Sequence, residues 1–272
     1  MTGASSPAGG QPAGHIQEAL RDGIATLTIS NPARRNSMTL AMWRQLAASL
    51  ARLREAPDLR VLALTGAGSQ AFVSGADISE FDQARDSAEA AAVYNQAVAE
   101  AQDALARFPA PTVALIQGAC MGGGIGLALA CDLRYASASA RFRMPAARLG
   151  LGYGYADMRR VVAVTGMAAA FELFYTARTL DAEQAQAGGL LHERFALDDF
   201  ERLSQARLQR IAANAPLSLR AAKAAILASM REPSAAELET IAALVRQCFD
   251  SADYAEGRRA FAERRDPVFT GR

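Results

Sequence analysis

The chain of 272 residues has few of the side chains that metal and redox sites usually require. It contains two histidines, His15 and His192, and three cysteines, Cys120, Cys131 and Cys248, with no CxxC or HExxH spacing. Zinc sites and dithiol redox motifs normally show such pairs. An odd number of scattered cysteines also argues against a disulfide framework. We therefore expect no metal site, and a reducing compartment.

Lysine, aromatic residues and net charge are also scarce. Lys223 is the only lysine among 29 basic residues, aromatic residues make up 7% of the chain, and the formal net charge is +1. Schiff-base chemistry would therefore depend on one residue. A nearly neutral chain lacks the positive potential that attracts nucleic acid, so no nucleic-acid partner is expected. The apolar content of 51% excludes an extensively disordered protein.

No apolar run reaches the roughly 18 residues without charge that a membrane span needs, so we expect no membrane segment. The first fourteen residues are rich in Gly, Ala, Pro and Ser, and they lack the basic and apolar regions of a signal peptide. We predict a flexible tail over residues 1–14 and a cytoplasmic location.

Strand and helix patterns alternate along the first half of the chain. Apolar runs predict strands at 24–30, 61–65, 112–117, 133–136 and 141–144, and helical spacing predicts helices at 39–55, 88–108 and 125–130, with Thr39 as an N-cap. This alternation favours an α/β domain. Residues 181–265 show mainly helical patterns, so we predict an α/β core over 15–200 and a helical region over 201–272.

Two glycine-bearing turns follow predicted strands, at 71–78 and at 122–124. Glycine permits backbone conformations and close approaches that a side chain would block. The second turn opens a helix, whose first N–H groups have no intrahelical acceptor and attract negative charge. We expect the two turns to direct N–H groups at one oxygen. Neither turn matches GxGxxG or GxxxxGK[ST], which disfavours dinucleotide and P-loop sites.

An ordered series of motifs over residues 16–269 resembles the crotonase, or enoyl-CoA hydratase/isomerase, superfamily. The motifs are Asn31-Pro32-x-x-Arg35-Asn36-Ser37, Ala71-Phe72-x-Ser74-Gly75-Ala76-Asp77-Ile78, Gly118-x-x-x-Gly122-Gly123-Gly124, Cys131-Asp132, the segment from Pro145 to Gly150, Ala187-Gly188-Gly189-Leu190, and Tyr254-x-Glu256-Gly257 with Phe261-x-Glu263-Arg264-Arg265. The resemblance implies an α/β fold, a crotonase-like spiral of ββα units with a helical C-terminal trimerisation region. It also implies a homotrimer or a dimer of trimers.

The resemblance further implies that the substrate is a coenzyme A thioester and that no other cofactor is needed. By resemblance, the N–H groups of Ala76 and Gly123 hold the thioester oxygen, and preorganised donors of this kind stabilise an enolate. The residues expected to bind coenzyme A are Arg34, Arg35, Ser74, Gly75, Asp77, Ile78, Met121, Gly122, Phe261 and Arg264. For Arg34 and Arg35, a solvated loop pair is the open alternative. Asp77 and Asp132 are also expected to serve as structural partners.

This sequence departs from the family pattern at the two glutamates that activate water in hydratases. The corresponding positions are Gly126 and Ala146, and neither residue carries a titratable group for acid–base work. Ordinary hydration is therefore not expected. Tyr153 falls where methylmalonyl-CoA decarboxylases of the superfamily carry an active-site tyrosine, but those enzymes have a histidine where this chain has Ala76.

Three functional hypotheses follow from these patterns. The first is an acyl-CoA-processing enzyme, a lyase or an isomerase, that stabilises an enolate. Its open reactions are decarboxylation of the methylmalonyl-CoA type using Tyr153, isomerisation, and a weak hydration that uses another acid. The second is a non-catalytic acyl-CoA-binding homologue that has lost the glutamates. The third is a serine peptidase on the related spiral fold of Clp-type proteases, which needs a Ser/His pair. It is least favoured because His192 is the only histidine expected in the folded region, with His15 assigned to the end of the tail.

Overall fold

The computed structural model describes residues 14–77 and 88–272, and its centre is a six-stranded sheet. The strand order is β1 (His15–Arg21), β2 (Ile24–Ser30), β3 (Val61–Gly66), β5 (Thr112–Ile116), β7 (Leu133–Ser137) and β10 (Glu193–Phe195). β1 is antiparallel to β2, and all the following neighbours are parallel. Parallel neighbours need crossover connections, which here run through helices.

A smaller sheet contains β4 (Ala71–Val73), β6 (Ala119–Met121), β8 (Arg141–Arg143) and β9 (Leu180–Asp181), in that order. Each of β3, β5 and β7 in the large sheet is followed in sequence by a three-residue strand of the small sheet, and then by a helix. The chain thus repeats a strand–strand–helix unit, which confirms the predicted spiral of ββα units.

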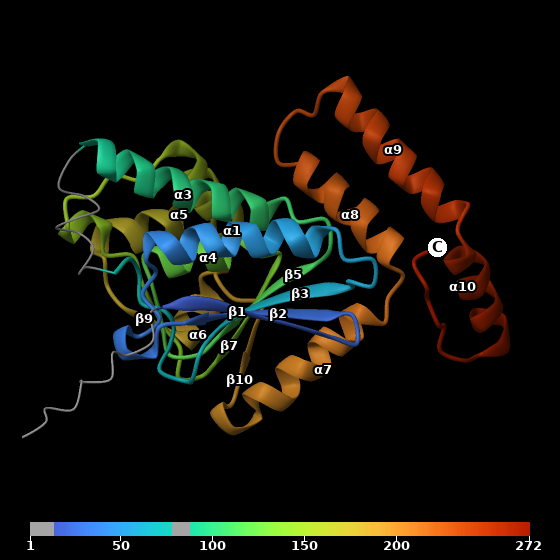
Figure 1. The fold of residues 1–272 in the computed structure, drawn as a ribbon, viewed down its shortest axis with the longest axis horizontal. Helices are drawn as coiled ribbons and strands as arrows, with labels where there is room; N and C mark the ends of the chain where they lie inside the picture. Colours follow the sequence, from blue (N-terminus) through green and yellow to red (C-terminus); the bar gives the residue numbers. More distant parts are fainter. Residues whose placement is uncertain (1–13, 78–87) are drawn as a thin grey trace, which may run out of the picture.

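Helices cover both faces of the large sheet (Figure 1). One face carries α1 (Leu40–Arg54), α3 (Ala88–Ala106), α4 (Gly123–Ala130) and α5 (Tyr155–Thr176), and the other carries α7 (Phe200–Ala212). The short α6 (Ala182–Ala187) connects β9 to β10. The last three helices, α8 (Pro216–Ala228), α9 (Ala235–Phe249) and α10 (Ala252–Glu263), extend to one side of the molecule.

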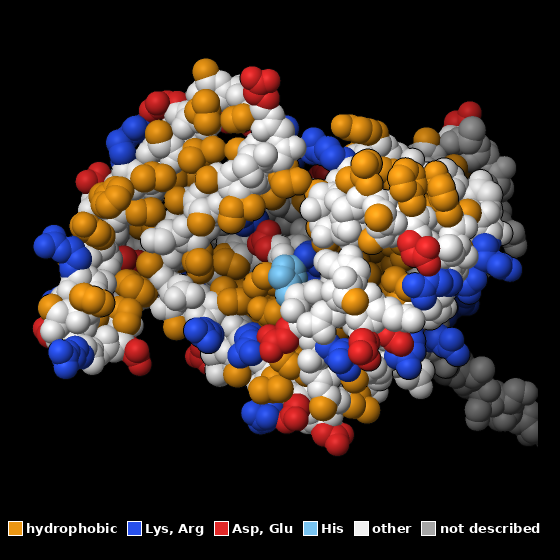
Figure 2. All heavy atoms as spheres, turned by 180° about the vertical axis from the view of Figure 1, so that it is seen from behind, with side chains coloured by type: hydrophobic (Ala, Val, Ile, Leu, Met, Phe, Trp, Pro, Cys, Tyr) orange, Lys and Arg blue, Asp and Glu red, His pale blue; other side chains and the backbone are white. Residues whose placement is uncertain are grey.

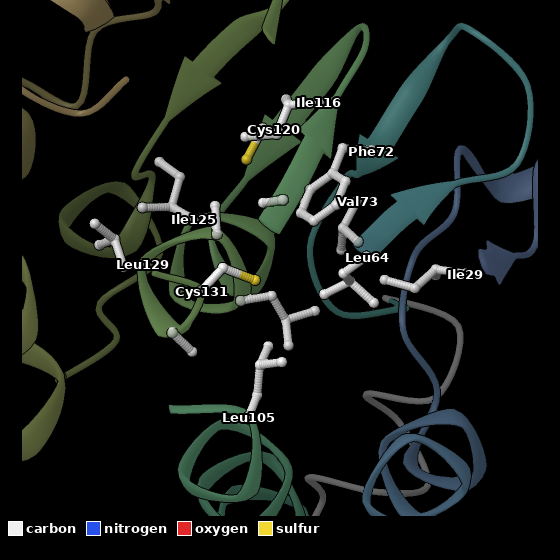
Figure 3. Close-up of a cluster of buried hydrophobic side chains, with 14 of the residues drawn as sticks. Ile29, Leu64, Phe72, Val73, Leu105, Ile116, Cys120, Ile125, Leu129 and Cys131 are labelled. Carbon is white, nitrogen blue, oxygen red and sulfur yellow. The ribbon is translucent and has the colours of Figure 1, made fainter. Parts of the chain in front are cut away.

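The main core lies between the large sheet and the first helical layer. Figure 3 shows Leu64, Phe72 and Ile116 from the strands in one cluster with Leu105 of α3, and each of these side chains is buried. A second cluster on the opposite face joins Ile24 and Val61 to Phe200 and Leu208 of α7. α7 therefore packs on the sheet, although it follows the division predicted at residue 200, while α8–α10 lie outside both clusters.

Several predicted elements are confirmed. β2 has the predicted bounds, and α1 begins after Thr39, whose Oγ1 accepts a hydrogen bond of 3.2 Å from the N–H of Met42. Within the described residues, no helix combines the length and the apolar character needed to cross a bilayer.

Other expectations require correction. His15 does not lie in the tail, because it begins β1, which pairs with β2 along its whole length. The turn predicted at 71–78 includes the short strand β4, and β6 lies unpredicted between the strand at 112–117 and the turn at 122–124. The helix α4 starts at Gly123 rather than at residue 125. The strand β10 interrupts the region predicted to be mainly helical, because three residues at a parallel sheet edge carry too little periodicity to be recognised.

The only lysine anchors α8 to the core. Nζ of Lys223 lies 2.7 Å from Oδ2 of Asp132 and donates a second hydrogen bond of 3.1 Å to the carbonyl oxygen of Ala110. The same carboxylate oxygen accepts from the N–H of Thr112 at 2.8 Å, where β5 begins. Asp132 is therefore a structural partner of strand residues, as expected.

Candidate functional site

The first glycine-bearing turn is held by a single bridge to the loop before α1. The N–H of Met38 donates to the oxygen of Gly75 at 2.9 Å, and the N–H of Asp77 donates to the oxygen of Met38 at 3.0 Å. In this parallel bridge between Met38 and Ala76, both hydrogen bonds of Met38 join it to the neighbours of Ala76 in the chain, Gly75 and Asp77. The N–H of Ala76 therefore points away from Met38. No described residue accepts a hydrogen bond from it.

The second turn connects β6 to α4. Gly122 has a φ of +51°, a left-handed conformation that favours glycine, and α4 begins at the next residue, Gly123. The first N–H group of α4 that donates a hydrogen bond within the turn is that of Ile125, which lies 3.0 Å from the carbonyl oxygen of Gly122. The N–H of Gly123 thus lies at the positive end of the helix dipole, and no residue of the described chain accepts from it.

Close backbone approaches bring the two turns together. A Cβ atom added to Gly124 would lie 2.5 Å from the carbonyl oxygen of Val73, the last residue of β4. Gly75, with a φ of +112°, lies against the carbonyl oxygen of Met121, which a Cβ would approach to 3.7 Å. Because β4 and β6 are parallel neighbours, the turns that follow them lie at the same edge of the small sheet.

Tyr153 reaches this edge from the segment before α5. Its hydroxyl oxygen lies 3.9 Å from the position of a Cβ at Gly122, and its half-buried ring packs edge-on against Phe174 with centroids 5.4 Å apart. The structure therefore brings the Tyr153 hydroxyl next to the glycine-rich turn. Its proposed role in chemistry stays a prediction.

The Arg34–Arg35 loop is joined to the first turn. Nη1 of Arg34 lies 3.0 Å from Oδ1 of the buried Asp77, while the N–H and hydroxyl of Ser74 donate to the carbonyl oxygens of Arg35 and Arg34, each at 3.2 Å. Asp77 is thus the structural partner of an arginine, as expected. The Ser74 N–H is already used within the protein, whereas Arg34 and Arg35 remain exposed.

Asn36 fixes the conformation of this loop. Its Nδ2 donates to the carbonyl oxygens of Ala67 and Ala71 at 2.9 and 2.7 Å, and its Oδ1 accepts from the N–H of Asn31 at 3.0 Å. These bonds hold the loop against the end of β3 and the start of β4.

The other described residues expected to bind coenzyme A lie in two different places. Met121 is half-buried in β6, beside the first turn, and Ile78 is outside the described residues. Phe261 and Arg264 lie on and just after α10, which Figure 1 shows beyond α8 and at the opposite side of the molecule from α4. The Phe261 side chain is 88% exposed. A single chain therefore does not bring these two residues to the Arg34 loop.

The two positions that lack the hydratase glutamates are occupied in different ways. Ala146 is 4% exposed and belongs to the main core. The space beside Gly126 is filled by the side-chain amide of Gln102, whose Nε2 would lie 2.5 Å from an added Cβ. Sequence reasoning did not identify Gln102, because only the packing of α3 against α4 brings it to this point.

Thiol and metal chemistry find no support in this region. Cys120 is completely buried beside the turn, and burial raises the pKa of its thiol far above the ordinary range. A protonated, enclosed thiol is a poor nucleophile. In the described ranges, no cluster of three or more His, Cys, Asp or Glu side chains is placed to hold a metal ion.

Comparison with known proteins gives the family. Residues 19–272 match the family model described as enoyl-CoA hydratase/isomerase. The chain belongs to the enoyl-CoA hydratase/isomerase family. It is 34% identical over 254 residues to the mitochondrial enoyl-CoA hydratase domain-containing protein 2 of Bos taurus, covering 92% of this chain and 85% of that protein. It is also 34% identical over 257 residues to a probable enoyl-CoA hydratase of Rhodobacter capsulatus, covering 94% and 98%.

A solved structure confirms the fold of this enoyl-CoA hydratase/isomerase family member. The enoyl-CoA hydratase/carnithine racemase from Magnetospirillum magneticum superposes with a TM-score of 0.89 at 37% sequence identity, over 94% of this chain and 96% of that one. The predicted crotonase-like α/β fold is therefore correct, and an enzyme of acyl-CoA metabolism is the general class to which the chain belongs.

Proposed function

We propose that this protein binds an acyl-CoA and stabilises a thioester enolate between the N–H groups of Ala76 and Gly123. The observation that supports this proposal is the meeting of two turns in which the N–H groups of Ala76 and Gly123 have no acceptor among the described residues. Charge that develops on the thioester oxygen would meet two fixed donors, one at the start of a helix. Donors that are already in place need no reorganisation during the reaction.

The reaction we propose is not ordinary hydration. Addition of water to an enoyl thioester requires groups that remove a proton from water and deliver one to carbon. The chain has Gly126 and Ala146 where the family's hydratases have glutamates, and Ala146 is packed into the core. Gln102, which lies beside Gly126, carries an amide that does not titrate.

Decarboxylation of a malonyl-type acyl-CoA is a second, more specific candidate, and the position of Tyr153 favours it. In this reaction the bond between the α-carbon and the carboxylate breaks, CO2 leaves, and the electron pair forms the enolate. The enolate then takes a proton at the α-carbon from water or from the Tyr153 hydroxyl. The step needs no strong base, which agrees with a site that has lost both glutamates.

A mass-spectrometric screen of acyl-CoAs, including malonyl-type and enoyl-type esters, tests these proposals. We expect loss of CO2 from a malonyl-type ester, and a decrease in kcat of about 10²-fold or more in Gly123→Pro, because this substitution removes one oxyanion donor. Proline is well tolerated at the first residue of a helix. Gly152→Ala is the control, since an added Cβ there has no atom within 4 Å.

The possible results separate the hypotheses. Gain of water by an enoyl ester would contradict our exclusion of hydration. Binding of acyl-CoA by calorimetry without any turnover would favour the non-catalytic homologue. Absence of binding to every ester would overturn the acyl-CoA site itself. Thermal unfolding of both variants checks that a lost activity is not a lost fold.

We also propose that the protein assembles as a homotrimer or a dimer of trimers, as the family resemblance implies. The apolar side chains that α8–α10 expose support this assembly, and Figure 2 shows hydrophobic atoms gathered over these helices. They include Ile226, Leu238, Phe249 and Phe261. In a trimer, Phe261 and Arg264 of one chain could complete the coenzyme A site of a neighbour. Sedimentation equilibrium would give the mass, and a monomer at micromolar concentration would contradict this proposal.

The cytoplasmic location also stays a proposal, supported by cysteines that show no disulfide pattern. The bovine relative is named as mitochondrial. Fractionation of the source cells would decide between these compartments.

A further inference from the structure

Gln102 is a polar residue inside the molecule, next to the first turn of α4. Its side chain belongs to α3, the residue is 4% exposed, and its carboxamide lies against the Cα of Gly126. Gly126 follows Gly123 by three residues, so both lie on the same face of α4. Because Cα–Cβ bonds tilt toward the helix N-terminus, a side chain at residue 126 would lean toward Gly123. The Gln102 amide occupies that space.

Arg160 of α5 fixes the orientation of this amide. Its Nη1 donates a hydrogen bond of 3.0 Å to Oε1 of Gln102, and its Nη2 donates one of 3.1 Å to Oδ1 of Asp103. A guanidinium group has donors only, so the atom of Gln102 that faces it must be the carbonyl oxygen. The NH2 group therefore faces Gly126, and the closest approach to the added Cβ is indeed from Nε2.

The NH2 group of Gln102 is a donor that lacks an acceptor. None of the described residues accepts a hydrogen bond from Nε2, although the residue is more than nine-tenths buried. Nε2 keeps some accessible surface, because it is not one of the fully enclosed, unpartnered polar atoms of the described residues, so water or a ligand can supply the acceptor. The hydrogen bond from the Arg160 cation draws electron density toward Oε1, which makes the NH2 group a stronger donor.

We propose that Gln102 is a specificity-determining residue that donates a hydrogen bond to a carboxylate on the acyl group of the CoA substrate. The inference rests on the acyl-CoA site proposed above and adds to it the residue that selects a carboxylate-bearing acyl group. A saturated or enoyl hydrocarbon chain offers no acceptor to this NH2 group, whereas a malonyl-type group carries two carboxylate oxygens. Arg160 acts through Gln102 as a positioning residue.

Binding of two CoA esters of similar shape tests this proposal. Malonyl-CoA and isovaleryl-CoA differ in having a carboxylate or an isopropyl group at the same position. Isothermal titration of the full chain should give a malonyl-CoA affinity at least about tenfold higher, since a hydrogen bond to a charged group has this order of effect. Mass spectrometry of each sample after the titration identifies any ester that has reacted.

Substitutions test whether the side-chain amide of Gln102 causes the preference for malonyl-CoA. Gln102→Met keeps the volume and removes the donor, so we expect the ratio of the two affinities to fall toward one while isovaleryl-CoA still binds. Gly126→Ala should give the same result from the opposite helix, because its Cβ displaces Nε2. Gln96→Met is the matched control on α3, since Gln96 is exposed and bonds to Glu100 at 2.8 Å.

Each result has a distinct meaning. The role of Gln102 is supported if the ratio of the malonyl-CoA and isovaleryl-CoA affinities falls toward one in Gln102→Met and Gly126→Ala but stays at the wild-type value in Gln96→Met. Equal affinities of the wild-type protein for the two esters, or an unchanged ratio in Gln102→Met, would overturn the role and leave the acyl-CoA site standing. If the wild-type protein binds neither ester, the proposed function fails as well.

Discussion

The indole Nε1 of Trp43 donates a hydrogen bond of 2.9 Å to the hydroxyl oxygen of Tyr94, and this hydroxyl donates one of 3.0 Å to the carbonyl oxygen of Met38. The Met38 oxygen also accepts from the N–H of Asp77 in the first turn. The Trp43 ring lies 3.4 Å from the position of a Cβ at Gly123 in the second turn. One buried aromatic pair therefore borders both turns of the site.

Removal of the Tyr94 hydroxyl should weaken this arrangement. In Tyr94→Phe the buried indole N–H of Trp43 loses its acceptor, so we expect the free energy of unfolding to fall by about 1–3 kcal/mol. Urea denaturation measures this change. Tyr155→Phe is the control, since Tyr155 is 81% exposed and its substitution should change stability by less than about 0.5 kcal/mol. Equal unfolding midpoints for the two variants would contradict the prediction.

Asn36→Asp should be destabilising although it hardly changes the shape of the side chain. An ionised carboxylate accepts hydrogen bonds only, so it cannot replace the two donations to the carbonyl oxygens of Ala67 and Ala71. We expect a loss of about 2–4 kcal/mol in the free energy of unfolding, since one buried and one half-buried carbonyl oxygen lose their donor and face a negative charge.

The matched control for this prediction is Asn95→Asp, at an exposed position of α3. Chemical denaturation at pH 7 compares the two variants with the wild-type protein. Stability of Asn36→Asp equal to that of the control would show that the loop before α1 does not depend on this side chain.

Gly124→Ala should disturb the contact between the two turns. The new Cβ would lie 2.5 Å from the oxygen and 2.9 Å from the Cβ of Val73, so α4 or β4 must move. Overpacking of this kind costs about 1–3 kcal/mol, and the displaced turn should also bind acyl-CoA more weakly. Gly152→Ala, where an added Cβ has no atom within 4 Å, should leave both stability and affinity unchanged. Crystal structures of the two variants would show directly whether the turns separate.

Stability should decrease at alkaline pH because of two buried thiols. Burial raises the pKa of Cys131 from an ordinary value near 9.0 to about 12, with Asp132 adding to the shift, and burial also raises the pKa of Cys120. Above pH 9 the unfolded chain therefore loses thiol protons that the folded chain retains. The free energy of unfolding should then fall with rising pH by up to about 1.4 kcal/mol per pH unit and thiol.

Guanidinium denaturation at pH 8 and pH 10 measures this effect. The contribution of the thiol is the difference between the wild-type protein and Cys131→Ala, because this substitution leaves every other ionisable group in place. If the free energy of unfolding falls by the same amount between pH 8 and pH 10 in both proteins, the assignment of the effect to Cys131 is contradicted.

The sequence predicted the elements whose bounds depend on residues that are close together in the chain. Thr39 is recognisable as an N-cap because the capping bond to Met42 spans only three residues. The bounds of β2 follow from the alternation of apolar side chains up to Asn31-Pro32. In the candidate site, the two turns were recognisable from their glycines and from the order of the family motifs.

The features that the sequence did not predict depend on contacts between segments that are far apart in the chain. Gln102 reaches Gly126 only because α3 packs against α4, and no pattern within either helix marks that approach. Strands β4 and β6 have three residues each, which is too short for a period of two to be recognised. Placement of Phe261 and Arg264 relative to coenzyme A depends on the path of α10, for which local periodicity gives no information.

The ion pair between Lys223 and Asp132 has a practical consequence for chemical labelling. Lys223 carries the only side-chain amine of the chain, and that side chain is 10% exposed and bonded to two oxygens at the base of α8. Amine-directed dyes, cross-linkers and surface immobilisation would therefore find almost no reactive side chain in the folded protein. If such a reagent modifies Lys223, the extent of modification reports how often α8 detaches from β5 and its neighbours.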